Sequence, residues 1–106
     1  MTRWVEVFRA DDLLPGEGRT VLAGDFRLAV FNHDGQFFAI DDACPHQGGP
    51  LGEGLFHEGR VICPWHSWVF DVRSGACPRG SHGGVKTYPT RRADGAVEVQ
   101  LPAAVE

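Results

Sequence analysis

Apolar residues occur along this chain in short runs that are separated by turns rich in glycine and proline. In the last run, residues 96–101, apolar residues alternate with glutamate and glutamine, as they do in a strand with one buried face. The other runs lie at residues 4–8, 19–23, 26–31, 37–40, 60–63, 68–72 and 85–88. The pattern predicts a chain built mainly of short β-strands.

Turn signals between these runs support the same interpretation. Asp-Gly pairs in HDGQ at residues 33–36 and ADGA at 93–96 are typical of tight β-hairpins, and RSG at 73–75 is a third candidate turn. A single short helical turn is expected in ADDLL at 10–14, because Pro-Gly follows at residues 15–16.

Glycine and proline also limit the fold class. Fourteen glycines and seven prolines interrupt the chain too often for long helices. We therefore predict an all-β fold, a small antiparallel sandwich or barrel into which residues 43–70 are inserted as two glycine- and proline-rich loops. A length of 106 residues favours one domain over residues 1–106, because two cores would each be too small to be stable.

Composition and charge narrow the range of partners and locations. The net charge of −4 argues against binding to nucleic acid or to an anionic membrane surface, both of which call for basic patches. No apolar stretch approaches the ~20 residues of a membrane span. The N-terminal residues lack the pattern of a signal peptide, which predicts a cytoplasmic protein.

Four residues suggest a metal site: Cys44, His46, Cys63 and His66, spaced as C-x-H-x16-C-x-x-H. A proline follows each cysteine and stiffens its loop, which lowers the entropy cost of holding ligands in place. Two thiolates and two imidazoles can hold a tetrahedral zinc ion. Each loop, however, contains one cysteine and one histidine, and mixed loops match a two-iron, two-sulfide cluster in which one iron has cysteine and the other histidine ligands.

On these residues the chain resembles the Rieske family of iron-sulfur proteins. The segment CPWHSWVFDVRSG at 63–75 is similar to the family's second cluster loop and the strand that follows, and the resemblance covers residues 3–101. It implies one Rieske-type 2Fe-2S cluster, with Cys44 and Cys63 on the inner iron and with His46 and His66 on the outer one. Residues 43–70 then form the cluster-binding subdomain.

The resemblance also shows where this chain departs from the family. Ser67 occupies a position where glycine is usual, and serine is small enough for the site. Gly49 and Trp65 occupy the positions at which high-potential members carry an additional disulfide, and Trp68 and Phe70 occupy the positions of hydroxyl donors. We therefore expect a midpoint potential toward the lower end of the ~−150 to +300 mV range of such centres.

A cluster whose ligands all come from the protein has no open coordination position, so no catalytic residue is expected. The resemblance implies a ferredoxin that carries single electrons from a flavin reductase to an oxygenase. The opening WVEVFRADDLLPGEG at 4–18 is also similar to the small subunit of NAD(P)H-dependent nitrite reductases, whose large subunit contains sirohaem. A zinc-stabilised binding module without redox activity is the third alternative.

Other residues with chemical potential receive simpler interpretations. Trp65 is expected to shield the cluster from water or simply to pack. Cys77 is expected to be a structural thiol, and His57, beside a Glu-Gly turn, is not expected to be a ligand. His82 lies among glycines in a candidate third loop near the cluster.

Overall fold

The computed structural model describes residues 2–44, 49–65, 68–77 and 84–102. Its elements are β1 (Thr2–Arg9), the 3-10 helix η1 (Ala10–Asp12), β2 (Gly18–Ala23), β3 (Phe26–His33), β4 (Gln36–Asp41), the 3-10 helix η2 (Leu51–Glu53), β5 (Leu55–His57), β6 (Arg60–Ile62), β7 (Val69–Asp71), β8 (Thr87–Tyr88), β9 (Thr90–Ala93) and β10 (Ala96–Pro102). The all-β prediction is confirmed.

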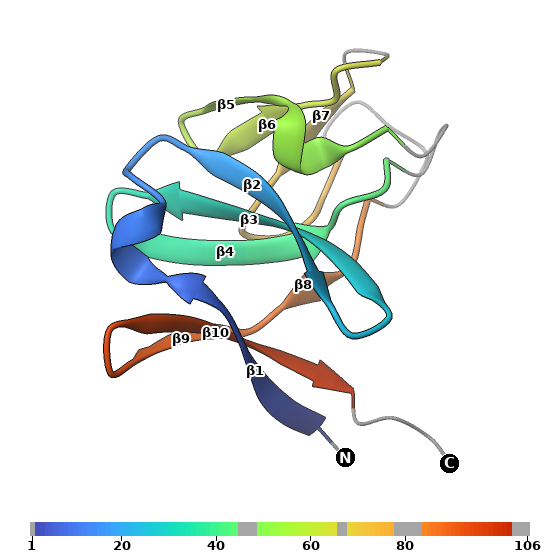
Figure 1. Cartoon of the computed structure of the whole chain (residues 1–106). Coiled ribbons are helices and arrows are strands. Elements are labelled where there is room, and N and C mark those ends of the chain that lie inside the picture. Colours follow the sequence, from blue (N-terminus) through green and yellow to red (C-terminus); the bar gives the residue numbers. More distant parts are fainter. Residues whose placement is uncertain (1, 45–48, 66–67, 78–83, 103–106) are drawn as a thin grey trace.

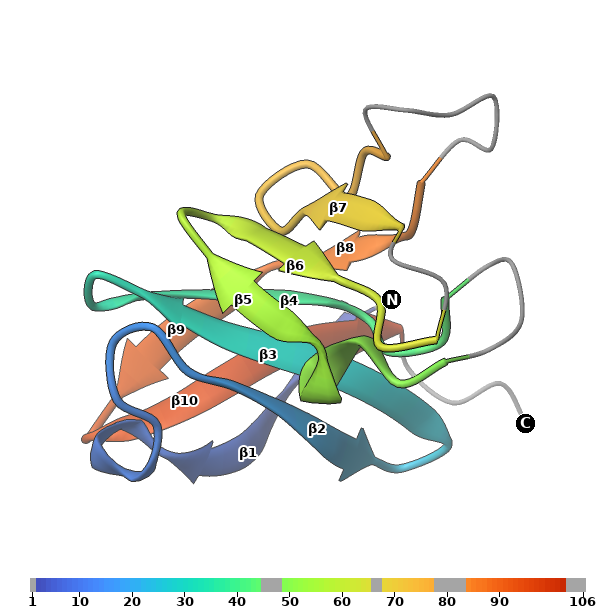
Figure 2. The same ribbon diagram turned by 90° about the horizontal axis from the view of Figure 1, so that it is seen from above.

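Within the described residues, these strands form antiparallel sheets with the orders β1-β10-β9, β2-β3-β4-β8 and β5-β6-β7. Figure 1 shows the sheets as layers, with β5–β7 above the central sheet and β1, β9 and β10 below it. The view from above shows the same stacking, with the short strands β5 and β6 lying over β3 and β4 (Figure 2). Among the described residues, no helix has the length and apolar character needed to cross a membrane.

The central sheet is buried on both faces, which explains the unbroken apolar run in β3. Successive side chains of a strand point to opposite faces. Leu28 and Val30 accordingly lie in the lower core, whereas Ala29 and Phe31 lie in the upper core. All four side chains are fully buried. A strand covered on both faces is expected to read as continuous apolar sequence rather than as an alternation.

The lower core lies between the central sheet and the β1-β10-β9 sheet. Its buried members are Phe8, Ala10, Leu13, Ala23, Leu28, Val30, Phe37, Ala39, Tyr88, Val97, Val99 and Leu101. The alternation predicted for residues 96–101 is confirmed, because Val97, Val99 and Leu101 are fully buried while Glu98 and Gln100 remain partly exposed.

The upper core lies between the central sheet and the β5-β6-β7 sheet. Phe56, Val61 and Phe70 stand opposite one another across the three short strands, and they pack with Phe31, Ile40 and Leu51. Strand β5 was not among the predicted runs, because Leu55 and His57 are exposed and only Phe56 packs against the core, which leaves no apolar run to detect. Residues 43–70 are therefore more than two loops, since they contain strands β5 and β6 and the start of β7.

The turns match their predictions closely. Asp34 and Gly35 have φ of 52° and 93°, and Asp94 and Gly95 have φ of 51° and 78°, so both Asp-Gly hairpins form as predicted. Helix η1 lies within the predicted helical segment. Glu58 and Gly59, which were predicted as a turn, also have positive φ and join β5 to β6 as a further hairpin.

Two strands differ from their predictions for physical reasons. Strand β8 is shorter than the predicted run 85–88, because the amide of Val85 bonds the carbonyl oxygen of Gly75 at 2.8 Å instead of joining the sheet. Strand β9 was not predicted from the sequence. Its residues Thr90–Ala93 are mostly polar and partly or fully exposed, so they show no apolar pattern.

Candidate metal centre

Each of the two predicted ligand cysteines opens a loop that is closed at its base by a backbone hydrogen bond. The amide of Cys44 donates to the carbonyl oxygen of Gly49 at 2.9 Å, and the amide of Cys63 donates to the carbonyl oxygen of Trp68 at 2.7 Å. We call residues 44–49 the first loop and residues 63–68 the second loop. In both, the closing residue is the fifth after the cysteine, so the two loops are closed by a hydrogen bond of the same spacing.

The two cysteines are brought into a single apolar environment. Cys44 and Cys63 are 2% and 1% exposed, and both pack in the upper core with Leu51, Val61 and Phe70. Neither forms a disulfide. Two buried cysteines at the starts of the two loops form half of the predicted donor set, with the soft sulfur ligands that iron-sulfur clusters require.

Gly49 brings the first loop against the second. A Cβ atom added at this position would lie 3.0 Å from Sγ of Cys63 and 3.1 Å from the ring of Trp65. A side chain here would therefore occupy space beside the sulfur. Because glycine has no side chain, the backbone of the first loop can lie directly against this sulfur, and the apolar surroundings shared by the two buried thiols fit a sulfur-ligated cluster. The contact also shows that positions 49 and 65, at which the resemblance places the disulfide of high-potential members, are neighbours in this fold.

The structure does not describe the histidine half of the predicted site. His46, His66, Ser67 and His82 all fall outside the residues that the structure describes. Among the described residues, no group of three or more His, Cys, Asp or Glu side chains is placed to hold a metal ion. That part of the chain contains only two of the four predicted ligands, Cys44 and Cys63.

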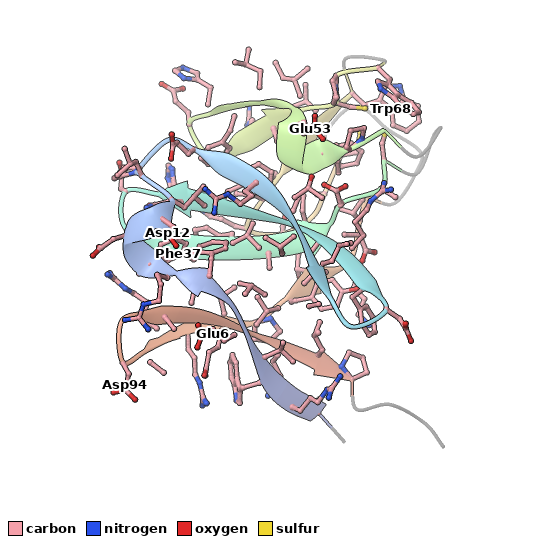
Figure 3. The ribbon with its side chains drawn as sticks, in the orientation of Figure 1. Glu6, Asp12, Phe37, Glu53, Trp68 and Asp94 are labelled. Carbon is pink, nitrogen blue, oxygen red and sulfur yellow. The ribbon has the colours of Figure 1, made fainter. Side chains whose placement is uncertain are left out.

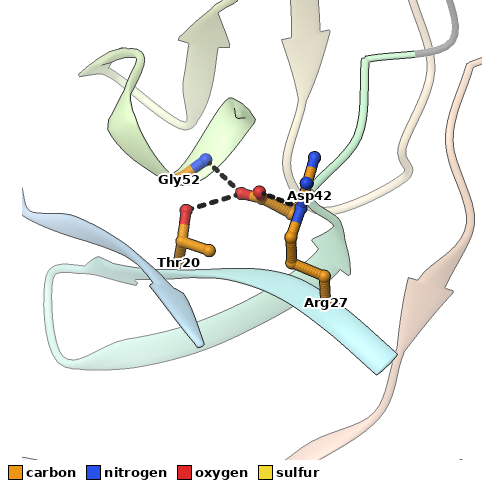
Figure 4. Close-up of polar contacts among 4 residues, drawn as sticks. All are labelled: Thr20, Arg27, Asp42 and Gly52. Carbon is orange, nitrogen blue, oxygen red and sulfur yellow. Dashed lines mark hydrogen bonds and ion pairs between the residues drawn. The ribbon is translucent and has the colours of Figure 1, made fainter. Parts of the chain in front are cut away.

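Behind the first loop lies a buried carboxylate that the sequence analysis did not single out. Oδ1 of Asp42 accepts hydrogen bonds from the amide of Gly52 at 2.7 Å and the hydroxyl of Thr20 at 2.8 Å, and Oδ2 lies 2.8 Å from Nε of Arg27 (Figure 4). The only sequence signal was an acidic residue two positions before Cys44, which is too common to be diagnostic.

The neighbouring Asp41 ties the start of the same segment to β8. Its Oδ1 accepts a hydrogen bond of 2.6 Å from the hydroxyl of Tyr88. Burial and this carboxylate both raise the pKa of Tyr88, so its hydroxyl stays protonated and keeps donating. The strand that leads into the first loop is thus anchored by two consecutive aspartates, one bound to β8 and the other to β2, β3 and η2.

The second loop is supported differently. It follows β6 and precedes β7, whose inward side chains Val61 and Phe70 are fully buried. Trp68, which closes the loop, packs against the upper core at the end of the β5–β7 layer (Figure 3). Trp65 is 56% exposed, so it covers the loop's surface without being part of the core.

The remaining candidates are also placed by the structure. Cys77 is half-buried against the upper core, which agrees with a structural thiol. The side chain of His57 is 78% exposed beside Glu58, in agreement with the expectation that it is not a ligand. Asp71, at the end of β7, accepts a hydrogen bond of 2.8 Å from the amide of Arg73, so its carboxylate caps the turn predicted at 73–75.

These features define a class of protein: a small layered β-protein in which two loops, closed by hydrogen bonds of the same spacing, bring buried cysteines into one apolar cluster. The model of the Rieske [2Fe-2S] domain matches residues 3–89, and the chain belongs to this family. A Rieske-type 2Fe-2S cluster is accordingly its cofactor.

Individual relatives cover almost the whole chain. It is 34% identical over 103 residues to the anthranilate 1,2-dioxygenase ferredoxin subunit of Burkholderia cepacia, covering 95% of this chain and 94% of that one. It is 33% identical over 107 residues to the nitrite reductase (NADH) small subunit of Salmonella typhimurium strain LT2, covering 94% and 99%. A chain in the complex of reduced oxygenase and oxidized ferredoxin in carbazole 1,9a-dioxygenase superimposes with a TM-score of 0.86 at 30% identity, covering 97% of both chains.

Proposed function

We propose that this protein is a Rieske-type ferredoxin that passes single electrons from a flavin reductase to an oxygenase. Cys44, His46, Cys63 and His66 are the proposed cluster ligands. The observation that carries the proposal is the contact between the two cysteine loops, where the missing side chain of Gly49 lets the first loop lie directly against Sγ of Cys63. The similarity to a dioxygenase ferredoxin subunit over nearly the whole chain supports the same role.

The chain's own residues explain how the site would work. When bound, the cluster takes up and releases one electron at a time. The buried thiols of Cys44 and Cys63 hold the inner side of the site away from water. The hydrogen bonds that close the loops fix the backbone of both cysteines, so the ligands need not move when the charge changes. Trp65, exposed at the loop surface, lies where a partner protein would approach.

A second candidate function is the small subunit of an NAD(P)H-dependent nitrite reductase. It is favoured by the similarity to the Salmonella small subunit, which extends over 99% of that protein. A subunit role would be compatible with the loss of the cluster ligands. This chain retains all four predicted ligands, which favours an active electron carrier. Membership of the Rieske family argues against the zinc-stabilised module.

The ligand assignment is tested on anaerobically purified protein. We expect iron and acid-labile sulfide in equal amounts. We also expect an EPR signal of a cluster with mixed nitrogen and sulfur ligands. Replacing His46 with cysteine would leave three cysteines and one histidine as ligands, so it should shift the signal toward that of an all-cysteine cluster and lower the midpoint potential, because a thiolate adds negative charge. His57→Cys is the matched control and should leave the signal unchanged. An unchanged spectrum in His46→Cys would show that the assignment is wrong.

The choice between the two partners needs a separate experiment. A ferredoxin should be reduced by a flavoprotein reductase and should support turnover of an oxygenase that does not turn over without it. A nitrite reductase subunit should instead co-purify with a large sirohaem protein. Co-purification without any electron delivery to an oxygenase would overturn the ferredoxin proposal.

The proposal also includes a location and an organisation for the chain. We place the protein in the cytoplasm, where a reducing environment disfavours disulfides, and none of Cys44, Cys63 and Cys77 forms a disulfide. We also propose that residues 1–106 form a single domain with a cluster-binding subdomain at about 43–70. The contribution of Ala29, Phe31 and Ile40 of the central sheet to the upper core supports one cooperative unit.

A further inference from the structure

We propose that Asp42 is a positioning residue for the first loop and that its ion pair with Arg27 sets the electrostatic environment of the cluster. The inference deepens the proposed function, because it rests on Cys44 being a ligand. Its observations are the contacts of Asp42 with β2, β3 and η2, all of which lie within the described part of the chain (Figure 4).

Asp42 joins the two ends of the first loop. Its backbone carbonyl accepts from the amide of Leu51 at 2.7 Å, and its carboxylate accepts from the amide of the next residue, Gly52, at 2.7 Å. Together with the bond between Cys44 and Gly49, these contacts form a ladder across the base of the loop. The outgoing and returning backbones are therefore held in one register around Cys44.

The same residue fastens this ladder to the scaffold. The amide of Asp42 donates to the carbonyl oxygen of Arg27 at 3.1 Å, while its carboxylate contacts the hydroxyl of Thr20 and the guanidinium of Arg27. Gly52 makes this arrangement feasible, because a Cβ there would lie 2.5 Å from the amide nitrogen of Thr20. The first loop thus has a fixed position relative to β2 and β3.

A buried carboxylate is a costly way to attach a loop. The side chain of Asp42 is completely buried, whereas that of Arg27 is 45% exposed. Removing an ion from water costs several kcal/mol, and apolar replacements of buried ion pairs are often neutral or stabilising. The lower core joins its two sheets with apolar side chains, and Asp42 is the only charged residue among the buried ones that the structure describes. Stability alone therefore does not account for a charge at this position.

The position of the charge gives it a function. Two residues of extended chain span at most roughly 7 Å, so the carboxylate lies in the immediate surroundings of Cys44. A fixed negative charge there disfavours the arrival of an electron, and the guanidinium of Arg27 partly offsets it. The pair thereby sets the midpoint potential through two opposing charges that cannot move apart.

The first test uses Asp42→Asn and Arg27→Gln in the cluster-loaded protein. Asp42→Asn should raise the ratio of reduced to oxidised protein at a fixed ambient potential, and Arg27→Gln should lower it, each by on the order of tenfold for a unit charge at an effective dielectric constant of ~20. The double variant should lie between the two. The surface variant Asp11→Asn, with the same chemical change in an exposed residue, should have little effect.

Opposite shifts would not arise from a merely structural role, which predicts changes in stability without a sign that follows charge. Ratios for both variants equal to that of Asp11→Asn would overturn the proposal. If Asp42→Asn does not fold, Arg27→Gln decides alone, because its half-exposed side chain tolerates replacement. In that case an unchanged ratio is the contradicting result.

The second test does not depend on the cluster. Asp42→Ala removes the acceptor of the Gly52 amide, so hydrogen exchange at Gly52 should accelerate at least tenfold, whereas Asp42→Asn keeps an acceptor oxygen and should exchange nearly as slowly as the unaltered protein. Unchanged exchange in Asp42→Ala would show that the clamp is not formed. A missing cluster signal in the unaltered protein would instead refute the proposed function and leave this measurement valid.

Discussion

The two cysteine loops are closed by hydrogen bonds of the same spacing, but different interactions hold them in place. In both, the amide of the cysteine donates a hydrogen bond to the carbonyl oxygen of the fifth residue after it. Both thiols are buried in the upper core. The first loop is fastened by the polar contacts of Asp42 with Thr20, Arg27 and Gly52. The second loop is carried by the β6–β7 hairpin, whose inward side chains are apolar.

This difference shows that one site can be preorganised by two kinds of physical interaction. Polar contacts are directional, so the first loop depends on individual donors and acceptors at defined distances. Apolar packing is non-directional, so the second loop depends on filled volume. Replacing the cysteine that each loop contains should have the largest effect on the cluster. Replacing the residues that hold only one of the loops in place should have smaller effects.

Replacement of either shared thiol should have the largest effect. Cys44→Ser and Cys63→Ser each remove a proposed iron ligand, and both should abolish the visible absorption and the EPR signal of the cluster. Cys77→Ser is the matched control, because this thiol is half-buried and outside the proposed ligand set, and it should retain the cluster. Retention of a normal signal in Cys44→Ser or Cys63→Ser would contradict the site.

The apolar support of the second loop is tested with Phe70→Ala. A fully buried phenylalanine leaves a large cavity, so the free energy of unfolding should fall by about 3–5 kcal/mol. Phe8→Ala in the lower core is the matched control. Urea unfolding should show a comparable loss for both variants, but only Phe70→Ala should also release the cluster more readily at low urea. Equal cluster retention would mean that packing under the second loop does not hold Cys63.

The polar support of the first loop is tested with Gly52→Ala. The added methyl would lie 2.4 Å from the Thr20 hydroxyl oxygen, and the required shift should lower the free energy of unfolding by about 1–3 kcal/mol. Gly35→Ala has open space but a φ of 93°, so only backbone strain of about 1–2 kcal/mol is expected. Thermal unfolding followed by circular dichroism measures both. Loosening of the cluster in Gly35→Ala but not in Gly52→Ala would reverse the comparison.

Much of the fold could be predicted from local sequence. Asp-Gly pairs determine hairpins because both central residues need positive φ, and the alternation at residues 96–101 reports one buried face. Strands β5 and β9 could not be predicted this way. The first has a single side chain packed against the core, Phe56, between two exposed residues, and the second is polar because it is partly or fully exposed.

For the site, the division between sequence and tertiary structure has a physical cause. The sequence by itself determined the type of ligands and their spacing, because coordination chemistry is a property of residue types and of short stretches of chain. Only the tertiary structure decided that the loops meet at Gly49 and that a buried Asp42 fastens the first of them. Thr20, Arg27 and Gly52 are distant in sequence, and contacts among such residues arise only when the sheets pack.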